Sequence, residues 1–428
     1  MCQVKQKIFL SLAAVFLCFS AWATPTVNAP SVFAGDNLGK VENNARGTPI
    51  PSMSSSTISS SGKVQQAVVL NPVPPVLNVH GYVLEDVYSG KVLASQNPDQ
   101  RMAPASLTKL MTLYLTFEAL QAGRIHMTDM VPISQNAWKT GGSRMFVKVG
   151  DRVPLSDLID GVIVDSGNDA CVALAEYIGG TEANFVNLMN VQAALMGMKN
   201  THYMDCTGLP DPEHYTTPHD MTILSRDIIL NFPQYYPLFA QKTFTYNKIT
   251  QPNRNRLLWR DAAVDGLKTG HTDEAGYCLI ASARYGDMRL LSVLMGAPTD
   301  ETRAQYTENL LNYGFHFYET HKLYKQNQII EQVPVYLGKT NRLPIGVAHD
   351  FYLTTISDQY PTVDIEMQMQ SPLKAPIKQG QKIGTVTAKL KGIEINSADL
   401  IALENISKGN LFSRTWDYIR LAMSKKSN

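Results

Sequence analysis

Residues 264–283 read VDGLKTGHTDEAGYCLIASA, and the tripeptide Lys268-Thr269-Gly270 in this stretch leads straight into the apolar run YCLIASA. Such a run is typical of a buried strand, and the small residues beside the tripeptide would let an extended peptide lie against the strand edge. The same tripeptide occurs at residues 139–141, where another Gly and a Ser follow it in a predicted loop. We interpret the earlier copy as a coincidence and the later copy as part of a binding site.

A serine three residues before a lysine occurs at several places, but only Ser106 and Lys109 open a predicted helix, over residues 104–123. A spacing of three places both side chains on one face of that helix. A hydroxyl becomes a good nucleophile when a base within hydrogen-bond reach takes its proton. Lys109 can be that base if burial or a second cation disfavours its ammonium form. The other pairs lie in a Ser-rich tract and beside prolines: Ser60 with Lys63, and Ser371 with Lys374.

The pattern Ser-x-Asn has a structural context at one of its three positions. Ser166-Gly167-Asn168 follows the apolar run DGVIV and precedes a predicted helix over residues 169–178. A tight turn there would project the Ser166 and Asn168 side chains into a cleft. Residues 95–97 and 134–136 have no such framing, and we interpret them as ordinary turns.

Length and composition are those of a globular protein with more than one domain. The chain has 428 residues, 44% of them hydrophobic, and a formal net charge of +1. A length of this order predicts two folded domains with additional segments. The near-zero charge, without a long basic run, gives no reason to expect nucleic-acid binding.

The N-terminus predicts export. Residues 1–23 have a short basic region, an apolar run and small residues before a cleavage position after Ala23, which are the features of a secretory signal. Residues 24–73 are rich in Ser and Pro, and we expect a disordered leader there. Of the five cysteines, three lie beyond this region, at positions 171, 206 and 278. An odd and sparse set of this kind allows at most one disulfide, and the sequence leaves open whether one forms.

The remaining chain divides by its patterns into three parts. Residues 74–321 combine a strand hairpin around Ser89-Gly90, several helices and two strands joined near Gly286. Residues 322–410 consist of short alternating runs between Pro, Gly and Asn signals, which indicates a small all-β domain. Residues 411–428 predict a basic amphipathic helix with an apolar stripe, which we expect to lie on an anionic membrane surface rather than against its own protein. The stripe comprises Phe412, Trp416, Ile419 and Met423.

The three motifs occur in the order that the serine penicillin-recognising enzymes have. With the framing stretches PASLTKLMT (104–112), DSGNDACVALAE (165–176) and VDGLKTGHTDEAGY (264–277), residues 75–428 resemble a periplasmic D-alanyl-D-alanine carboxypeptidase of the low-molecular-mass penicillin-binding protein type. The long leader is not covered by this resemblance.

The resemblance implies a fold and a reaction. The fold is an α/β transpeptidase-like (β-lactamase-like) domain with an antiparallel sheet flanked by helices, then a small all-β sandwich domain and a C-terminal amphipathic helix. The reaction removes the terminal D-alanine from peptidoglycan stem peptides ending in D-Ala-D-Ala, through an acyl-enzyme that β-lactam antibiotics also form. No cofactor or metal is implied, and the protein would lie at the periplasmic face of the inner membrane, attached to the membrane surface through its C-terminal helix.

The resemblance also implies a role for each motif residue. Ser106 would be the nucleophile and Lys109 its base, with Ser166 and Asn168 relaying the proton and orienting the substrate. Lys268 would help to keep Lys109 neutral, and the backbone amides of Ser106 and His271 would form an oxyanion hole. The expected substrate-binding residues are Thr269, Gly270, His271 and Arg303, the last at the terminal carboxylate of the substrate.

Other functions stay open at this point. An endopeptidase that cuts D-Ala-diaminopimelate cross-links would use the same nucleophile. A weak serine β-lactamase shares the motifs, but its characteristic Glu-x-x-Leu-Asn pattern occurs here at residues 308–312, after the other motifs instead of between them. A catalytically silent wall-binding protein would not need every motif residue.

Overall fold

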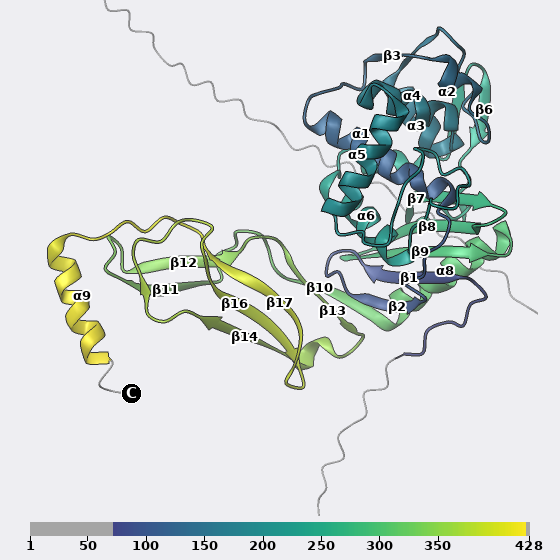
Figure 1. Ribbon diagram of the computed structural model, residues 1–428. Helices are drawn as coiled ribbons and strands as arrows, with labels where there is room; N and C mark the ends of the chain where they lie inside the picture. The colour runs from purple at the N-terminus through teal and green to yellow at the C-terminus, as the bar shows by residue number, and fades with distance from the viewer. Residues whose placement is uncertain (1–71, 425–428) are drawn as a thin grey trace, which may run out of the picture. The chain divides into compact units, whose positions relative to one another are not determined.

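The structure, a computed structural model, describes residues 72–424 (Figure 1). The expected signal and nearly all of the expected leader lie outside the described residues. The N-terminal part of the described chain is α/β and the C-terminal part is all-β, as the sequence predicted.

A five-stranded antiparallel sheet with strand order β2-β1-β9-β8-β7 forms the centre of the α/β part. The hairpin predicted around Ser89-Gly90 is its β1–β2 pair. The strand β7, which carries the second Lys-Thr-Gly tripeptide, lies at one edge of the sheet. The strand bounds are β1 (Gly81–Asp86), β2 (Val92–Gln96), β7 (Val264–Thr272), β8 (Gly276–Tyr285) and β9 (Met288–Ala297).

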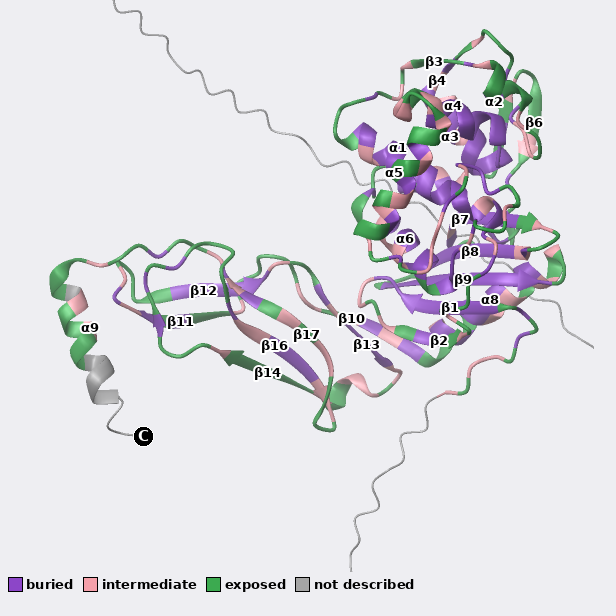
Figure 2. Cartoon of the chain, in the orientation of Figure 1, coloured by how far each residue is buried: buried purple, intermediate pink, exposed green. Residues whose placement is uncertain are grey.

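Helices cover both faces of this sheet, as the side chains of β9 show. Leu291 and Val293 pack into a core with α1, α4 and α6, whereas Leu290 and Leu294 pack against α8. Every residue of β9 is therefore buried (Figure 2). A sheet covered on both faces favours a mostly apolar strand, and only Arg289 and Ser292 in β9 have polar side chains. The helices are α1 (Lys109–Gln121), α2 (Gln135–Lys139), α3 (Leu155–Asp160), α4 (Asn168–Gly179), α5 (Glu182–Leu195), α6 (Pro218–Asn231), α7 (Leu257–Arg260) and α8 (Asp300–Phe317).

Shorter elements complete the α/β part. The 3-10 helix η1 (Ala105–Thr108) leads into α1, the single π-helical turn η2 (Gly161–Asp165) precedes Ser166, and η3 (Tyr236–Ala240) follows α6. Two small hairpins pair β3 (Met130–Pro132) with β4 (Arg152–Pro154), and β5 (Thr243–Tyr246) with β6 (Ile249–Pro252).

Two glycines allow other segments to approach η1 closely. Gly208 has a φ of +89°, and a Cβ there would lie 1.8 Å from the Ala105 carbonyl oxygen. A Cβ on Gly270 would lie 3.1 Å from the Pro104 carbonyl oxygen. The loop around Gly208 and the strand β7 can therefore both lie against the turn that carries Ser106.

The all-β part has a hydrophobic core of its own, built from a six-stranded sheet and the β10–β13 pair. The six-stranded sheet has the order β14-β16-β17-β12-β11-β15 and is antiparallel except between β11 and β15. The all-β part contains the following strands and one 3-10 helix, η4: β10 (Tyr318–Tyr324), β11 (Glu331–Tyr336), β12 (Arg342–Val347), β13 (Phe351–Ile356), η4 (Tyr360–Thr362), β14 (Val363–Met369), β15 (Leu373–Lys374), β16 (Lys382–Leu390) and β17 (Ile393–Ala402).

The last helix, α9 (Leu411–Ser424), follows the all-β part. Its Asp417 carboxylate accepts a hydrogen bond from the Leu337 amide at 2.6 Å. Leu411 and Phe412 are 80% and 91% exposed. Within residues 72–424, no helix is long and apolar enough to cross a membrane.

Candidate active site

The first motif forms the hydrogen bond that its spacing predicted. Ser106 lies in η1 and Lys109 is the first residue of α1. The Lys109 Nζ donates to the Ser106 Oγ at 2.8 Å and to the Thr207 carbonyl oxygen at 2.6 Å. Ser106 is only partly buried, so a substrate can reach its hydroxyl, while Lys109 is 0% exposed.

Burial lowers the pKa of Lys109 below its ordinary value, and the positive charge of Arg254 lowers it further. Asp205, and the thiols of Cys171 and Cys206 when they are ionised, act in the opposite direction. Burial is the largest effect because it disfavours the charged amine. A neutral Lys109 can accept the proton of the Ser106 hydroxyl.

The second motif lies directly after the π-helical turn. Ser166 is 1% exposed and adopts a left-handed φ of 56°, which turns the chain before α4 begins at Asn168. The Asn168 Nδ2 donates to the Gly141 carbonyl oxygen at 2.6 Å, and its backbone amide donates to the Ser143 carbonyl oxygen at 2.7 Å. The side chain of Asn168 is therefore held against the loop that follows α2.

The third motif brings a second buried amine to Ser166. The Lys268 Nζ, on β7, donates to the Ser166 Oγ at 2.9 Å. The pKa of Lys268 is well below its ordinary value, first because of burial and then because of the charges of Lys109, Arg254 and Arg303. Repulsion between two buried amines is mutual, so the site disfavours charge on both Lys109 and Lys268 at once. Thr269 is also buried, and Gly270 lies against η1.

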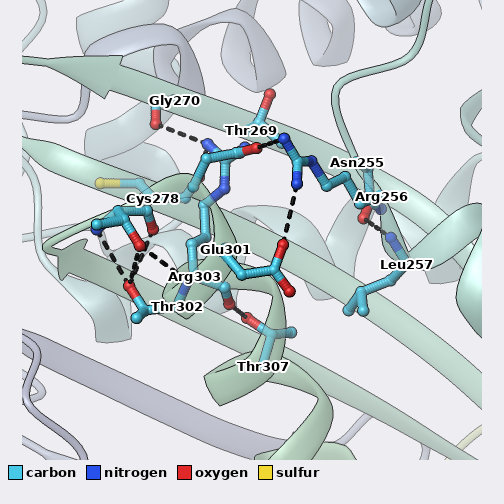
Figure 3. A network of polar contacts seen from close by, with 12 residues as sticks. Asn255, Arg256, Leu257, Thr269, Gly270, Cys278, Glu301, Thr302, Arg303 and Thr307 are labelled. Carbon is cyan, nitrogen blue, oxygen red and sulfur yellow. Dashed lines mark hydrogen bonds and ion pairs between the residues drawn. The ribbon is translucent and has the colours of Figure 1, made fainter.

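His271 and Arg303 line a pocket of about 490 Å³ beside β7, together with Arg254, Trp259 and Tyr277. His271 is exposed, and its ring lies 4.0 Å from that of Tyr277. Figure 3 shows how Arg303 is held: its guanidinium donates to the Gly270 and Cys278 carbonyl oxygens, each at 3.4 Å. It also forms an ion pair with Asp300. Most of the donor capacity of Arg303 is thus used within the protein.

Arg254 is a site residue that the sequence analysis missed. It is exposed, it lines the same pocket, and its Nη1 donates to the Ser143 Oγ at 2.7 Å. Its charge lowers the pKa values of both Lys109 and Lys268. It lies in the stretch PNRNRLLW (252–259), which has no recognisable catalytic pattern, so no signal in the sequence marked it.

The loop containing the first Lys-Thr-Gly copy also reaches the site. As predicted, this copy is not in a strand, because Lys139 ends α2 and a loop follows. Its Gly141 nevertheless supplies the carbonyl that holds Asn168. Asp169 fixes the continuation of this loop, since its carboxylate accepts hydrogen bonds from the amides of residues 145, 146 and 147.

The part of the chain that the structure describes contains no cluster of three or more His, Cys, Asp or Glu side chains that could hold a metal ion. The candidate site brings together a serine, two buried amines, a second serine, an asparagine and an edge strand. Such a set can form and hydrolyse an acyl-serine ester.

Comparison with known proteins identifies the family. A sequence profile for D-alanyl-D-alanine carboxypeptidase matches residues 69–299, and one for the C-terminal domain of penicillin-binding protein 5 matches residues 318–408. The D-alanyl-D-alanine carboxypeptidase DacC of Escherichia coli (strain K12) is 42% identical over 355 residues, which cover 81% of this chain and 89% of that protein.

Solved structures agree with this assignment. Penicillin-binding protein 5 from Haemophilus influenzae matches with a TM-score of 0.74 and 43% identity, over 79% of this chain and all of that chain. Penicillin-binding protein D2 from Listeria monocytogenes, in an ampicillin-bound form, matches with a TM-score of 0.53 and 30% identity, over 57% of this chain and all of that chain. Both the sequence profile and these relatives span more than half of the chain, which therefore belongs to the D-alanyl-D-alanine carboxypeptidase family of serine hydrolases.

Proposed function

We propose that Ser106 attacks the carbonyl carbon between the last two D-alanines of a peptidoglycan stem peptide, while Lys109 takes the proton of the hydroxyl. The observation that carries this proposal is the 2.8 Å hydrogen bond between a partly accessible serine and a fully buried lysine with a lowered pKa. A base within this distance can remove the proton as the new C–O bond forms.

The remaining motif residues act on the leaving group and the oxyanion. The C–N bond breaks, and the amine of the released D-alanine receives a proton through Ser166, which Lys268 holds by a hydrogen bond. The amides of Ser106 and His271 stabilise the negative oxygen, an effect for which one donor is worth about a hundredfold or more. Water then attacks the ester of Ser106, and the proton transfers run in reverse.

The substrate backbone pairs with the open edge of β7 and its carboxylate binds in the adjacent pocket. Only β8 pairs with β7 in the described sheet, so the other edge can add an extended peptide. Thr269 contacts the peptide from this edge. Three arginines line the pocket. We assign the terminal carboxylate to Arg254, because the guanidinium of Arg303 is buried against Asp300 and two carbonyl oxygens. Arg256 already forms ion pairs with Asp300 and Glu301. This revises the role that the resemblance implied for Arg303.

Arg254→Gln is expected to lower kcat/KM for a pentapeptide by about tenfold to a hundredfold, the effect of losing one charge-assisted hydrogen bond. With a pentapeptide amide, which lacks the carboxylate, the loss should be smaller, because only the effect of Arg254 on the pKa values of Lys109 and Lys268 remains. Arg303→Gln should chiefly lower Tm, because the Gly270 and Cys278 carbonyl oxygens lose their donor and Asp300 keeps only its ion pair with Arg256. If Arg303→Gln, and not Arg254→Gln, abolishes the discrimination between acid and amide, the assignment is wrong.

The proposed substrate preference is terminal D-alanine rather than cross-linked peptide, and the relatives' names favour it over the endopeptidase and β-lactamase alternatives. Purified protein incubated with a pentapeptide should release free D-alanine at a rate well above that at which it converts cross-linked dimers to monomers. Faster cleavage of dimers would contradict the preference.

We also propose that β-lactams acylate Ser106, in line with the ampicillin-bound relative. Rapid release of hydrolysed penicillin would instead indicate a β-lactamase.

We further propose that the protein is exported and that α9 attaches it to an anionic membrane surface at the periplasmic face. Leu411, Phe412, Trp416 and Ile419 form an exposed apolar face, with Phe412 at 91% and Trp416 at 58% exposure. The helix and its extension carry a net charge of +3 from Arg414, Arg420, Lys425, Lys426 and Asp417. Apolar burial and attraction to anionic lipid act together in such interfacial helices.

Removal of residues 411–428 should move the protein from the membrane to the soluble fraction without changing its activity on a small peptide. A more specific test is the double variant Phe412→Ser, Trp416→Ser, which should cosediment less with anionic vesicles than wild type does. The conservative variant Thr415→Ser should cosediment as wild type does. Unchanged binding of the truncated protein to such vesicles would show that another surface makes the contact.

A further inference from the structure

Two cysteines that are 35 positions apart in the sequence lie close together near Lys109. Cys171 lies on α4 and Cys206 lies 35 positions later, in the loop before α6. Both are 0% exposed. The Cys171 thiol donates to the Cys206 carbonyl oxygen at 2.9 Å, and the Cys206 thiol donates to the Glu182 carboxylate at 3.2 Å.

The Cys171 side chain also acts on the Cys206 thiol. Burial raises the pKa of the Cys206 thiol most, and a hydrogen bond with the Cys171 side chain is the next cause. The third cysteine is placed differently: Cys278 lies on β8, where its thiol faces the Ala275 carbonyl oxygen at 3.5 Å. Of the pairs that the three cysteines could form, the fold thus brings Cys171 and Cys206 together.

The segment that contains Cys206 positions the catalytic amine. The Cys206 carbonyl oxygen accepts the Thr112 hydroxyl at 2.8 Å, and the next carbonyl, of Thr207, accepts the Lys109 Nζ. Asp205 holds the same loop through the amides of Thr207 and Gly208, each at 2.6 Å. A covalent link at Cys206 would therefore join α4 to the loop that orients Lys109.

We propose that Cys171 and Cys206 form a disulfide in the exported protein. The two S–H bonds break and one S–S bond forms, and the two electrons and two protons pass to a disulfide oxidant, which becomes a pair of thiols. Exported proteins meet such oxidants, whereas cytosolic proteins are kept reduced.

The surroundings tolerate the loss of both thiol hydrogens. The Cys206 carbonyl oxygen keeps the Thr112 hydroxyl as a donor. The Glu182 carboxylate keeps the Cys206 backbone amide at 3.5 Å and the Asn136 side chain at 3.4 Å. Neither of these two acceptors is then left without a donor. Disulfide formation therefore does not cost the free energy of an unsatisfied buried hydrogen-bond acceptor.

The disulfide forms while the chain folds. In the folded protein the Cys206 thiol is fully buried and its raised pKa keeps it protonated, so it is a poor nucleophile. An oxidant reaches it before α4 and the loop close around it, and the finished bond is then shielded from reductants. Cys278 has neither of the other two described cysteines among its partners, and it stays a thiol.

The test is thiol mapping after refolding. The purified chain, produced without residues 1–23 and therefore without Cys2 and Cys18, is denatured, reduced, and refolded in a mixture of oxidised and reduced glutathione, then alkylated in denaturant and digested. We expect alkylation of Cys278 and a linked peptide that joins Cys171 to Cys206. Alkylation of all three cysteines, or a bridge that includes Cys278, would overturn the proposal. Because the oxidant is supplied, the result does not depend on export or on carboxypeptidase activity.

Thermal unfolding gives a second readout. Protein refolded with the oxidant should have a Tm roughly 5 to 10 °C above protein refolded with reductant, from the constraint that a disulfide places on the unfolded chain. Cys171→Ala, Cys206→Ala and the double variant should each lose this redox dependence, while Cys278→Ala should keep it. A redox-dependent Tm that persists in Cys206→Ala, or is missing in wild type, would contradict the bridge.

Discussion

Ser106→Ala is expected to abolish covalent labelling by benzylpenicillin and to lower turnover of a pentapeptide by at least about a thousandfold, the loss seen when a catalytic serine is removed. The side chain contributes only one oxygen, which accepts from Lys109, and it is partly exposed, so the variant should stay folded. Intact-mass spectrometry after incubation with the antibiotic measures the acyl adduct, and thermal unfolding checks the fold.

A matched control is available in the same chain. Ser371 belongs to another Ser-x-x-Lys pair but lies in the all-β part, just before β15. Ser371→Ala should label as wild type does. If Ser106→Ala still took up penicillin stoichiometrically, the nucleophile would have to be another residue.

Lys109→Met has the second largest expected effect: the rate of acylation should fall by about a hundredfold to ten-thousandfold, the contribution of a general base. Methionine fills much of the same space but cannot take a proton. In wild type the rate should decline as pH falls through the lowered pKa of Lys109, because the amine becomes charged. Stopped-flow acylation across a pH series measures both effects. Lys139→Met, at an exposed lysine that ends α2, should leave the rate unchanged.

The same lysine links stability to pH. Its pKa is lower in the folded protein than in the unfolded chain, so between these two values the unfolded chain binds more protons. Stability from this group is therefore present near the unfolded pKa and is lost as pH falls through the folded pKa. Lys109→Met should lack this component, so its Tm should depend less on pH than that of wild type. An identical pH dependence of Tm in the two proteins would mean that Lys109 is not buried as a neutral amine.

Much of the site was predictable because its residues come in local patterns. The proximity of Ser106 and Lys109 follows from their spacing on a helix. The placement of the Ser166 and Asn168 side chains at the site follows from the turn before α4. The order of the motifs then fixed the family. The hydrogen bond from Lys268 to Ser166 spans 102 positions, and no local pattern predicted it. The resemblance implied only that Lys268 acts on Lys109.

The missed features are those that depend on tertiary contacts. Arg254 lies in an unpatterned stretch and reaches the site only because its loop lies beside Ser143. Gly141 holds Asn168 through a backbone carbonyl, which any residue could supply. The helix α6 was also missed, although Thr217 as N-cap and Pro218 as first residue are an ordinary start signal. Which cysteines meet could not be predicted, since that depends on the packing of α4 against a loop.

The central claim is that Lys109 is a neutral amine next to Ser106, in a site that does not hold two ammonium charges. Its most direct test is nuclear magnetic resonance of the protein with ¹³C-labelled lysine, in which Lys109→Met identifies the Lys109 signal and pH is varied. This claim predicts that the Lys109 signal titrates below the ordinary lysine pKa of 10.5. Titration of Lys109 at or above that value would contradict it.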